Sequence, residues 1–252
     1  MVQHPELIAA YRELLQGMVA VYRDLEGGMT PPQRFPAGKR GYIDRLPNQD
    51  ANHAIVLKLA AMLNFLSGAL VLCEAGVVVP QGAVKRMADE AGEDVLFLVI
   101  GLTEGMTDRH EAFLDYFWRE DFANFDDPLN SFQSRPQVPR EKIVAAIHRI
   151  TDDPSTGNRV AKLLSKTYSG FVHAAAPHVM EIYDQETQTF AVESGPAIRR
   201  SDHERDLWNY MFRGAGAVAV AAKGFGSDAH FQRMKSIIDH FERRTESYGL
   251  GR

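Results

Sequence analysis

Apolar residues recur at intervals of three and four positions through most of this chain. The first series consists of Leu7, Tyr11, Leu14, Met18, Tyr22 and Leu25. Since an α-helix turns once every 3.6 residues, this spacing predicts an amphipathic helix with one apolar face. Gly27 and Gly28 end it, and Pro31 and Pro32 prevent it from resuming. The pattern returns along the chain, so the sequence predicts an all-α helical bundle of about eight helices.

Capping and breaking residues bound the other expected helices. These cover about 50–74, 80–105, 107–122, 139–150, 155–177, 201–223 and 227–247. The predicted N-caps are Ser155, Ser201 or Asp202, and Ser227, because their side-chain oxygens accept bonds from free backbone N–H groups. Pro177 is expected to kink or end the sixth helix.

Three stretches have the composition of loops. They are 29–48, 123–138 and an extended loop or short hairpin at 185–200, the only strand-like segment expected. The first is the most basic stretch, with Arg34, Lys39, Arg40 and Arg45, and loops this long are usually functional or disordered.

The length of 252 residues fits one helical domain, 1–252, with an N-terminal helix at 1–28 and the bundle core at 50–247. A net charge of −5 argues against a protein-wide surface for nucleic acid and leaves room for a local basic patch. Cys73 is the single cysteine, which excludes an intrachain disulfide and predicts a buried thiol.

The expected location is the cytoplasm, with no membrane association. The N-terminal segment lacks the basic start and apolar core of a signal peptide. The longest apolar stretch, taken as about 69–80, contains Glu74 and is too short to cross a bilayer.

The segment from Leu164 to His178 concentrates polar side chains near a proline. Ser169 lies four positions before His173, on the same face of a helix, and Tyr168 lies five before it. Histidine changes charge near neutral pH, so His173 is a candidate general acid or base. The alternative is a partly buried histidine that a neighbouring carboxylate or carbonyl satisfies.

Two charged series run along the predicted third helix. They are Lys85, Asp89 and Glu93, and Arg86, Glu90 and Asp94. A solvated face with ion pairs within the helix is the expected arrangement. Alternatively, one series borders the core, where Arg86 and Glu90 need partners and His173 is a candidate.

Signatures of metals and cofactors are absent from the sequence. Neither Glu-x-x-His, His-Glu-x-x-His nor a zinc-binding Cys/His spacing occurs. The run 213–226 contains Gly-x-Gly-x-x-Ala but follows a predicted helix rather than a strand, which favours close helix packing over nucleotide binding. No metal and no cofactor is therefore predicted.

Two blocks resemble a group of uncharacterised bacterial helical proteins. In CEAGVVVPQGAVKRMADEAGEDVLFL (73–98), a helix ends in a glycine turn and the next carries Lys-Arg-x-x-x-Glu. Tyr168-Ser169-x-x-x-His173 resembles their second signature, an aromatic and serine stretch before a histidine. These proteins are similar to the HEPN superfamily, helical domains of nucleotide and RNA transactions often found in toxin–antitoxin and antiphage systems. The resemblance covers roughly 50–180.

The resemblance implies a HEPN-like bundle that binds or acts on RNA or a nucleotide in a bacterial defence or toxin–antitoxin context. The candidate catalytic residues are His173, Arg86 and Glu90, and the candidate binding residues are Tyr168, Ser169, His178 and Arg40. Any activity would be a metal-independent, ribonuclease-like cleavage. HEPN ribonucleases carry arginine and then histidine after four to six residues, and the one match here is Arg233 with His240. Whether the chain is an enzyme stays open.

Two other functions stay open beside this one. The first is a non-enzymatic module that forms a homo-oligomer or binds a protein partner through an aromatic stretch. That stretch consists of Phe113, Tyr116, Phe117, Trp118, Phe122 and Phe125, and burial in the chain's own core is its alternative interpretation. The second is a small-molecule-binding bundle with a pocket lined by methionine and aromatic residues.

Overall fold

The computed structural model describes residues 2–149 and 153–250, and the side chain of Arg40 lies outside the described part. Its α-helices are α1 (Pro5–Glu26), α2 (Ala51–Ala75), α3 (Val78–Glu104), α4 (Asp108–Trp118), α5 (Arg140–His148), α6 (Pro154–Val172), α7 (Ala176–Val179), α8 (Ala197–Gly224) and α9 (Asp228–Thr245). Its strands are β1 (Gln33–Pro36), β2 (Tyr42–Arg45), β3 (Tyr183–Asp184) and β4 (Thr189–Phe190). The prediction of an all-α bundle is confirmed, and the eight expected helices correspond to α1–α6, α8 and α9.

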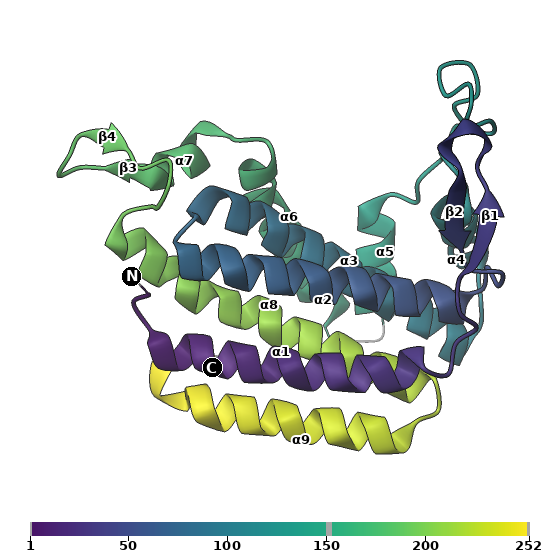
Figure 1. Ribbon diagram of the computed structural model, residues 1–252. Helices are drawn as coiled ribbons and strands as arrows, with labels where there is room; N and C mark the ends of the chain where they lie inside the picture. The colour runs from purple at the N-terminus through teal and green to yellow at the C-terminus, as the bar shows by residue number, and fades with distance from the viewer. Residues whose placement is uncertain (1, 150–152, 251–252) are drawn as a thin grey trace.

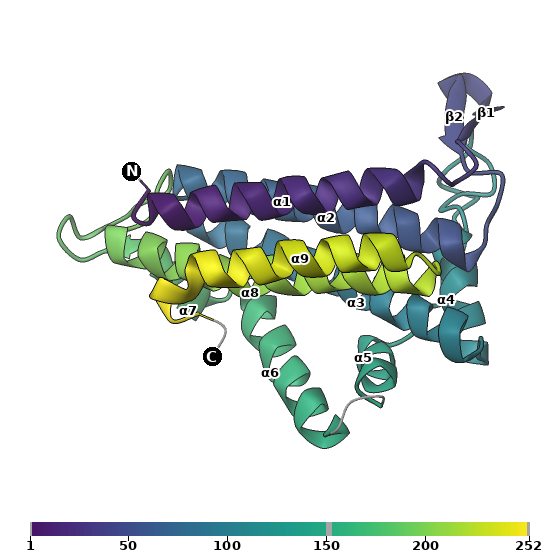
Figure 2. The ribbon, with the colours of Figure 1, turned by 90° about the horizontal axis from the view of Figure 1, so that it is seen from below.

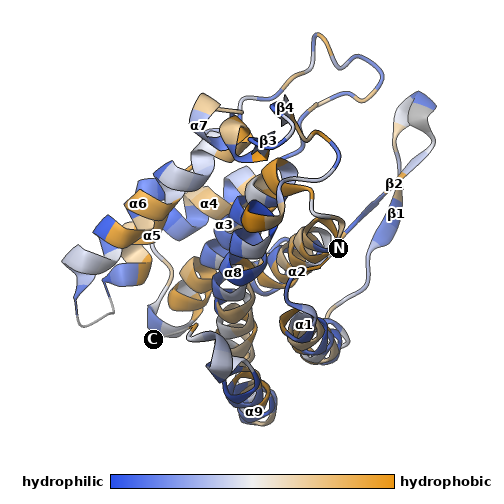
Figure 3. Cartoon of the chain, turned by 90° about the vertical axis from the view of Figure 1, so that its left-hand side faces the viewer, coloured by the Kyte–Doolittle hydropathy of each residue, from blue (hydrophilic) through white to orange (hydrophobic). Residues whose placement is uncertain are grey.

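The long helices α1, α2, α3, α8 and α9 lie side by side and enclose the core (Figure 1). Figure 2 shows α5 and α6 leaving one side of this bundle and converging at their far ends. Seen along the bundle, α5 and α6 form a separate layer, away from α1 and α9 (Figure 3). Both contact α3, so α3 is shared by the two layers.

The central helix is α2. Asp50 begins it by accepting a hydrogen bond from the backbone N–H of His53 at 2.9 Å, and Gly76 ends it in the left-handed region with φ of 74°. By length and composition α2 is apolar enough to cross a membrane, so the apolar segment is longer than the 69–80 stretch singled out from the sequence. A core helix passes the same test, and α2 packs against α1, α3 and α8.

Several helix ends differ from the prediction. Asp153 rather than Ser155 caps α6, through a 3.0 Å bond from the Thr156 N–H. α8 begins four residues before Ser201, after Pro196, whose backbone dihedral angles suit the position before a first helical turn. α4 stops at Trp118, because the chain becomes extended there and Phe122 pairs with Phe132 in an isolated bridge.

The predicted effect of Pro177 on the sixth helix is wrong. α6 ends at Val172, where Ala174 adopts the left-handed conformation with φ of 48°. The N–H of Ala175 bonds the Gly170 carbonyl at 2.8 Å, the hydrogen bond of a Schellman cap. Pro177 is the second residue of α7 instead.

The basic loop predicted at 29–48 contains an antiparallel hairpin of β1 and β2, which the sequence did not indicate. Arg34 pairs with Asp44 across it at 3.1 Å, and Arg45 forms an ion pair with Glu120. Two of the four predicted cations are therefore partly neutralised. The strand-like segment near 185–200 is confirmed as the short β3–β4 hairpin, and 123–138 is a loop with the single bridge at Phe132.

Gly82 of α3 lies directly against Phe171 of α6. A Cβ atom there would lie 2.5 Å from Cγ of Phe171, whereas a Cβ at Gly216 on α8 would meet nothing within 4 Å. We expect Gly82→Ala to lower the free energy of unfolding by about 1–3 kcal/mol through overpacking. Gly216→Ala should instead raise it by up to about 1 kcal/mol, because alanine favours helix. Urea unfolding measures both, and equal effects of the two substitutions would contradict this packing.

Candidate functional site

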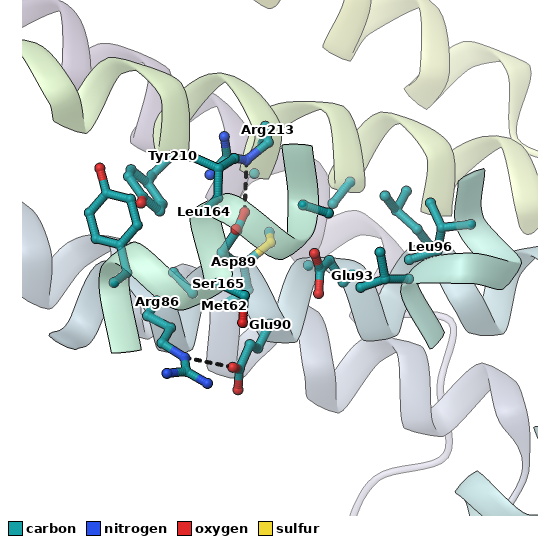
Figure 4. Close-up of a pocket in the computed structure, with 18 of the residues that line it drawn as sticks. Met62, Arg86, Asp89, Glu90, Glu93, Leu96, Leu164, Ser165, Tyr210 and Arg213 are labelled. Atoms are coloured by element: carbon teal, nitrogen blue, oxygen red, sulfur yellow. Dashed lines mark hydrogen bonds and ion pairs between the residues drawn. The ribbon is translucent and has the colours of Figure 1, made fainter. Parts of the chain in front are cut away.

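A cavity of about 390 Å³ lies between the bundle and the α5–α6 layer. Residues of α2, α3 and α8 form its floor, and residues of α5 and α6 form its roof. Figure 4 shows many of the lining side chains. Its apolar lining includes Met62, Leu66, Leu96, Val144, Ile147, Val160, Ala161 and Leu164. A volume of this size and a mainly apolar lining are typical of small-molecule sites.

The cavity exists because the roof is attached at two separated points. At one end Phe171 of α6 packs against Gly82, and at the other Arg140 of α5 binds the carboxylates of Glu93 and Asp94 on α3. The floor between them carries small residues, which do not fill the gap. These are Ala88, Gly92, Gly214 and Ala217. Gly214 also confirms the predicted close helix packing in 213–226, since a Cβ there would lie 2.6 Å from Cδ1 of Leu66.

The charged side chains of α3 are buried to different degrees. The side chain of Lys85 is 0% exposed and that of Asp94 is 7% exposed. Lys85 and Asp94 therefore border the core, which was the alternative, whereas Arg86 and Glu90 form the expected ion pair within the helix, with 39% of the Glu90 side chain exposed. The buried members have partners on neighbouring helices, because Lys85 pairs with Asp206 of α8, and Asp94 pairs with Arg140 of α5 and Lys58 of α2.

Three arginines line the cavity, and each binds a carboxylate of α3. Arg213 Nε lies 2.7 Å from Asp89 Oδ1, Arg86 Nε lies 2.8 Å from Glu90 Oε1, and Arg140 Nη2 lies 2.7 Å from Glu93 Oε2. Figure 4 shows the first two of these pairs on the cavity wall. Burial by itself lowers the pKa of Arg213, but Asp89 outweighs it and the pKa is raised, so the cation is held. Burial raises the pKa of Glu93 in spite of Arg140.

Behind the cavity wall lies a hydrogen-bonded network of buried and partly buried polar groups. The Tyr168 hydroxyl, at the cavity, donates to Asp206 Oδ2 at 2.7 Å, and Lys85 Nζ lies 2.5 Å from the same oxygen. Lys85 Nζ is also 3.4 Å from His203 Nδ1, and His203 Nε2 is 2.7 Å from Glu181. A lysine donor on Nδ1 implies that the proton of a neutral His203 sits on Nε2 and is donated to Glu181.

The Lys85 ammonium favours the ionised form of the Asp206 carboxylate. Burial alone would raise the pKa of Asp206, but Lys85 and the Tyr168 hydroxyl hold it below the usual value for an aspartate. Burial and the nearby Asp206 carboxylate raise the pKa of Tyr168, which keeps its hydroxyl protonated. The Lys85–Asp206 ion pair is therefore stabilised by a hydrogen bond from the protonated Tyr168 hydroxyl.

Of the residues predicted from the sequence, Arg86, Glu90 and Tyr168 come together at the cavity. Ser169 and His173 do not line it, and His173 is exposed at the end of α6. The cavity therefore brings Arg86 and Glu90 together without His173, the partner considered for them.

The two remaining predicted residues give no further support to a shared site. His178 also lies outside the cavity lining, and its ring packs edge-on against Phe171 with the centroids 4.5 Å apart. The side chain of Arg40 lies outside the described residues.

Sequence reasoning missed Arg140, Arg213, Asp206 and His203 as site residues. Arg213 and Asp89 are 124 positions apart, and Lys85 and Asp206 are 121 apart, so no local motif connects them. In residues 2–149 and 153–250, no group of three or more His, Cys, Asp or Glu side chains is arranged to hold a metal ion.

The aromatic stretch near α4 is largely part of the core. Phe113 is buried, and Phe117 and Trp118 pack against the core as partly buried residues. Phe132, from the following loop, is exposed. For the α4 residues, burial in the chain's own core is the interpretation that applies.

No protein-family model, no curated protein and no solved structure matches this chain. The resemblance to the HEPN superfamily stays a prediction from two short motifs. A functional proposal therefore depends on the chemistry of the cavity itself.

Proposed function

We propose that this protein binds a small, mainly apolar organic molecule in the cavity between the bundle and the α5–α6 layer. The observation that carries the proposal is the cavity of about 390 Å³, lined by apolar side chains and a few charged groups. Protein interiors are normally close-packed, and an unfilled apolar space costs stability. A ligand that fills the space removes that cost.

The charged groups at the wall favour a preformed site. The pairs Arg86–Glu90, Arg213–Asp89 and Arg140–Glu93 hold their side chains in place before any ligand enters. Such preorganisation reduces the entropy that binding must overcome. Apolar walls then supply affinity, and the few polar groups supply orientation.

The roof is the part of the fold that a ligand would complete. Phe171 is the one residue of α6 that is buried in the structure. Val160, Ala161 and Leu164 of α6 line the cavity, and none of them is buried. Ligand binding would give these side chains apolar contacts and tie α6 to the bundle.

We expect Ala161→Trp to abolish binding by filling the cavity. The neutral fluorophore N-phenylnaphthylamine is the probe, because its emission rises in an apolar site. Wild-type protein should bind it saturably, and Ala161→Trp should weaken binding by at least about tenfold. The free energy of unfolding of the variant in urea should be no more than about 1.5 kcal/mol below that of wild type, because the tryptophan fills the cavity.

Val192→Trp is the matched control, because Val192 is exposed and lies outside the cavity lining. It should bind the probe as wild type does. Val160→Trp offers a second filling variant at a half-exposed position if Ala161→Trp does not fold. The proposal is contradicted if wild type does not bind the probe saturably, or if the filled variants bind it as tightly as wild type does.

A further inference from the structure

We infer that the ligand carries a protonated amine at the end of its apolar part, and that the carboxylates of Asp89 and Glu93 bind this amine. The inference rests on the proposed function and deepens it, because it names the head group of the molecule in the same cavity. It starts from two carboxylate oxygens that the protein leaves without a donor.

Asp89 and Glu93 each use one carboxylate oxygen for an arginine. Asp89 Oδ1 accepts from Arg213 Nε at 2.7 Å, and Glu93 Oε2 accepts from Arg140 Nε at 2.8 Å. Within the described residues, no donor bonds the second oxygen of either side chain, Oδ2 of Asp89 or Oε1 of Glu93. Neither oxygen belongs to the buried polar atoms that lack a partner, so each keeps accessible surface.

The two carboxylates belong to the same stretch of the cavity floor. Asp89 and Glu93 lie four residues apart on α3, so their side chains leave the same face of the helix one turn apart. Figure 4 shows Glu93 between Asp89 and Leu96 in the lining, with the guanidiniums of Arg86 and Arg213 on opposite sides of the pocket. At this spacing one ammonium group can lie between the two carboxylates.

The arginine beside Glu93 has no donor left for a ligand. Arg140 Nε bonds Glu93, Nη1 bonds Asp94, and Nη2 bonds the Glu90 carbonyl oxygen at 2.6 Å. All three nitrogens of Arg140 therefore have partners. The ion pair of Arg140 and Glu93 offers the cavity an acceptor and no donor, which favours a ligand that donates.

The charges around Glu93 favour a cation over a neutral donor. Burial raises the pKa of Glu93, and repulsion from the Asp89 carboxylate adds to this, so that together they outweigh Arg140. The negative charge at this point of the wall is therefore incompletely compensated, and a cation between the two carboxylates would compensate it. An ammonium group has three donors, and hydrogen bonds between ionised partners are about twice as strong as neutral ones. The apolar remainder of the cavity accommodates the hydrocarbon part of the ligand.

Displacement of N-phenylnaphthylamine by octylamine, octanol and octanoate tests this inference. The three competitors share a chain and differ in the head group, and near neutral pH the amine is protonated, as a lysine side chain is. We expect octylamine to displace the probe at a concentration at least about tenfold lower than octanol does, and octanoate to be no better than octanol. Glu93→Gln should reduce the preference for octylamine over octanol to about twofold or less, because it removes the charge and keeps the shape. Arg140 should stay in place in this variant, since it keeps Asp94 and the Glu90 carbonyl.

Glu104→Gln is the matched control, because Glu104 is a glutamate of the same helix, paired with Arg149 and outside the cavity lining. It should leave the preference for octylamine intact. Asp89→Asn repeats the test if Glu93→Gln does not fold. Equal displacement by octylamine and octanol, stronger displacement by octanoate, or a preference for octylamine that survives both substitutions overturns the inference alone. A wild-type protein that binds no probe contradicts the proposed function as well.

Discussion

Lys85→Met should lower the free energy of unfolding by about 3 kcal/mol. Lys85 is fully buried and pairs with Asp206 at 2.5 Å, and removal of one member of a buried pair leaves the other uncompensated. The expected loss is at the lower end of the range for such pairs, because 32% of the Asp206 side chain is exposed. Urea unfolding near neutral pH measures it.

The exposed pair Lys223–Asp228 is the matched control, with side chains 59% and 75% exposed. Lys223→Met should change stability by no more than about 1 kcal/mol. If Lys85→Met lowers the free energy of unfolding no more than Lys223→Met does, the polar network around Asp206 does not depend on the Lys85 cation.

Acid should reduce the difference in free energy of unfolding between wild type and Lys85→Met. The pKa of Asp206 in the folded protein lies below its usual value, so the pair contributes stability above about pH 4, the pKa of an unfolded aspartate. That contribution is lost as the pH falls through the folded pKa. A difference that stays constant into acid would assign the effect of Lys85 to packing instead of charge.

Arg140→Ala should cost about 3 kcal/mol and release α5 from the bundle. Its guanidinium joins the first turn of α5 to Glu93, Asp94 and the Glu90 carbonyl of α3. Truncating one partner of a buried, hydrogen-bonded charge pair costs about 2–5 kcal/mol. Amide hydrogen exchange in α5 should accelerate, and probe binding should fall with it, because α5 forms part of the cavity roof.

Arg149→Ala is the control, since Arg149 follows the same helix and its side chain is 65% exposed in an ion pair with Glu104. It should leave α5 exchange and probe binding unchanged, with a stability effect of no more than about 1 kcal/mol. Unchanged exchange of α5 in Arg140→Ala would mean that the helix is held by its apolar contacts alone.

The sequence predicted helix ends well where the capping residue lies within a few positions of the end. The helix expected over 50–74 matches α2, which Asp50 and Gly76 bound, because capping depends on side chains and dihedral angles within a few residues. Pro177 misled because α6 had already ended at a left-handed alanine, Ala174, a conformation that sequence reasoning assigns first to glycine or asparagine. The hairpin of β1 and β2 was missed because its strands are short and exposed, with no apolar alternation.

The candidate site was only partly predictable for a different reason. The spacing on α3 singled out Arg86 and Glu90, yet a charged ladder on one helix looks the same whether water or another helix faces it. Burial of Lys85 and Asp94 follows from the packing of α5, α6 and α8, which is long-range information. His173 carried the strongest chemical argument in the sequence, and it lies at an exposed helix end outside the cavity. RNA or nucleotide binding by a HEPN-like protein stays a prediction.

The most direct test of the cavity as a binding site is methyl NMR of the intact protein during titration with octanol. The methyl groups of Leu66, Ile147 and Leu164 line the cavity and should shift in a saturable manner. Those of Leu129, which is 93% exposed in the loop after α4, should not move and serve as the internal control. Saturable shifts confined to the lining residues are the predicted result. No shifts, or shifts of Leu129 as large as those in the lining, would contradict the account.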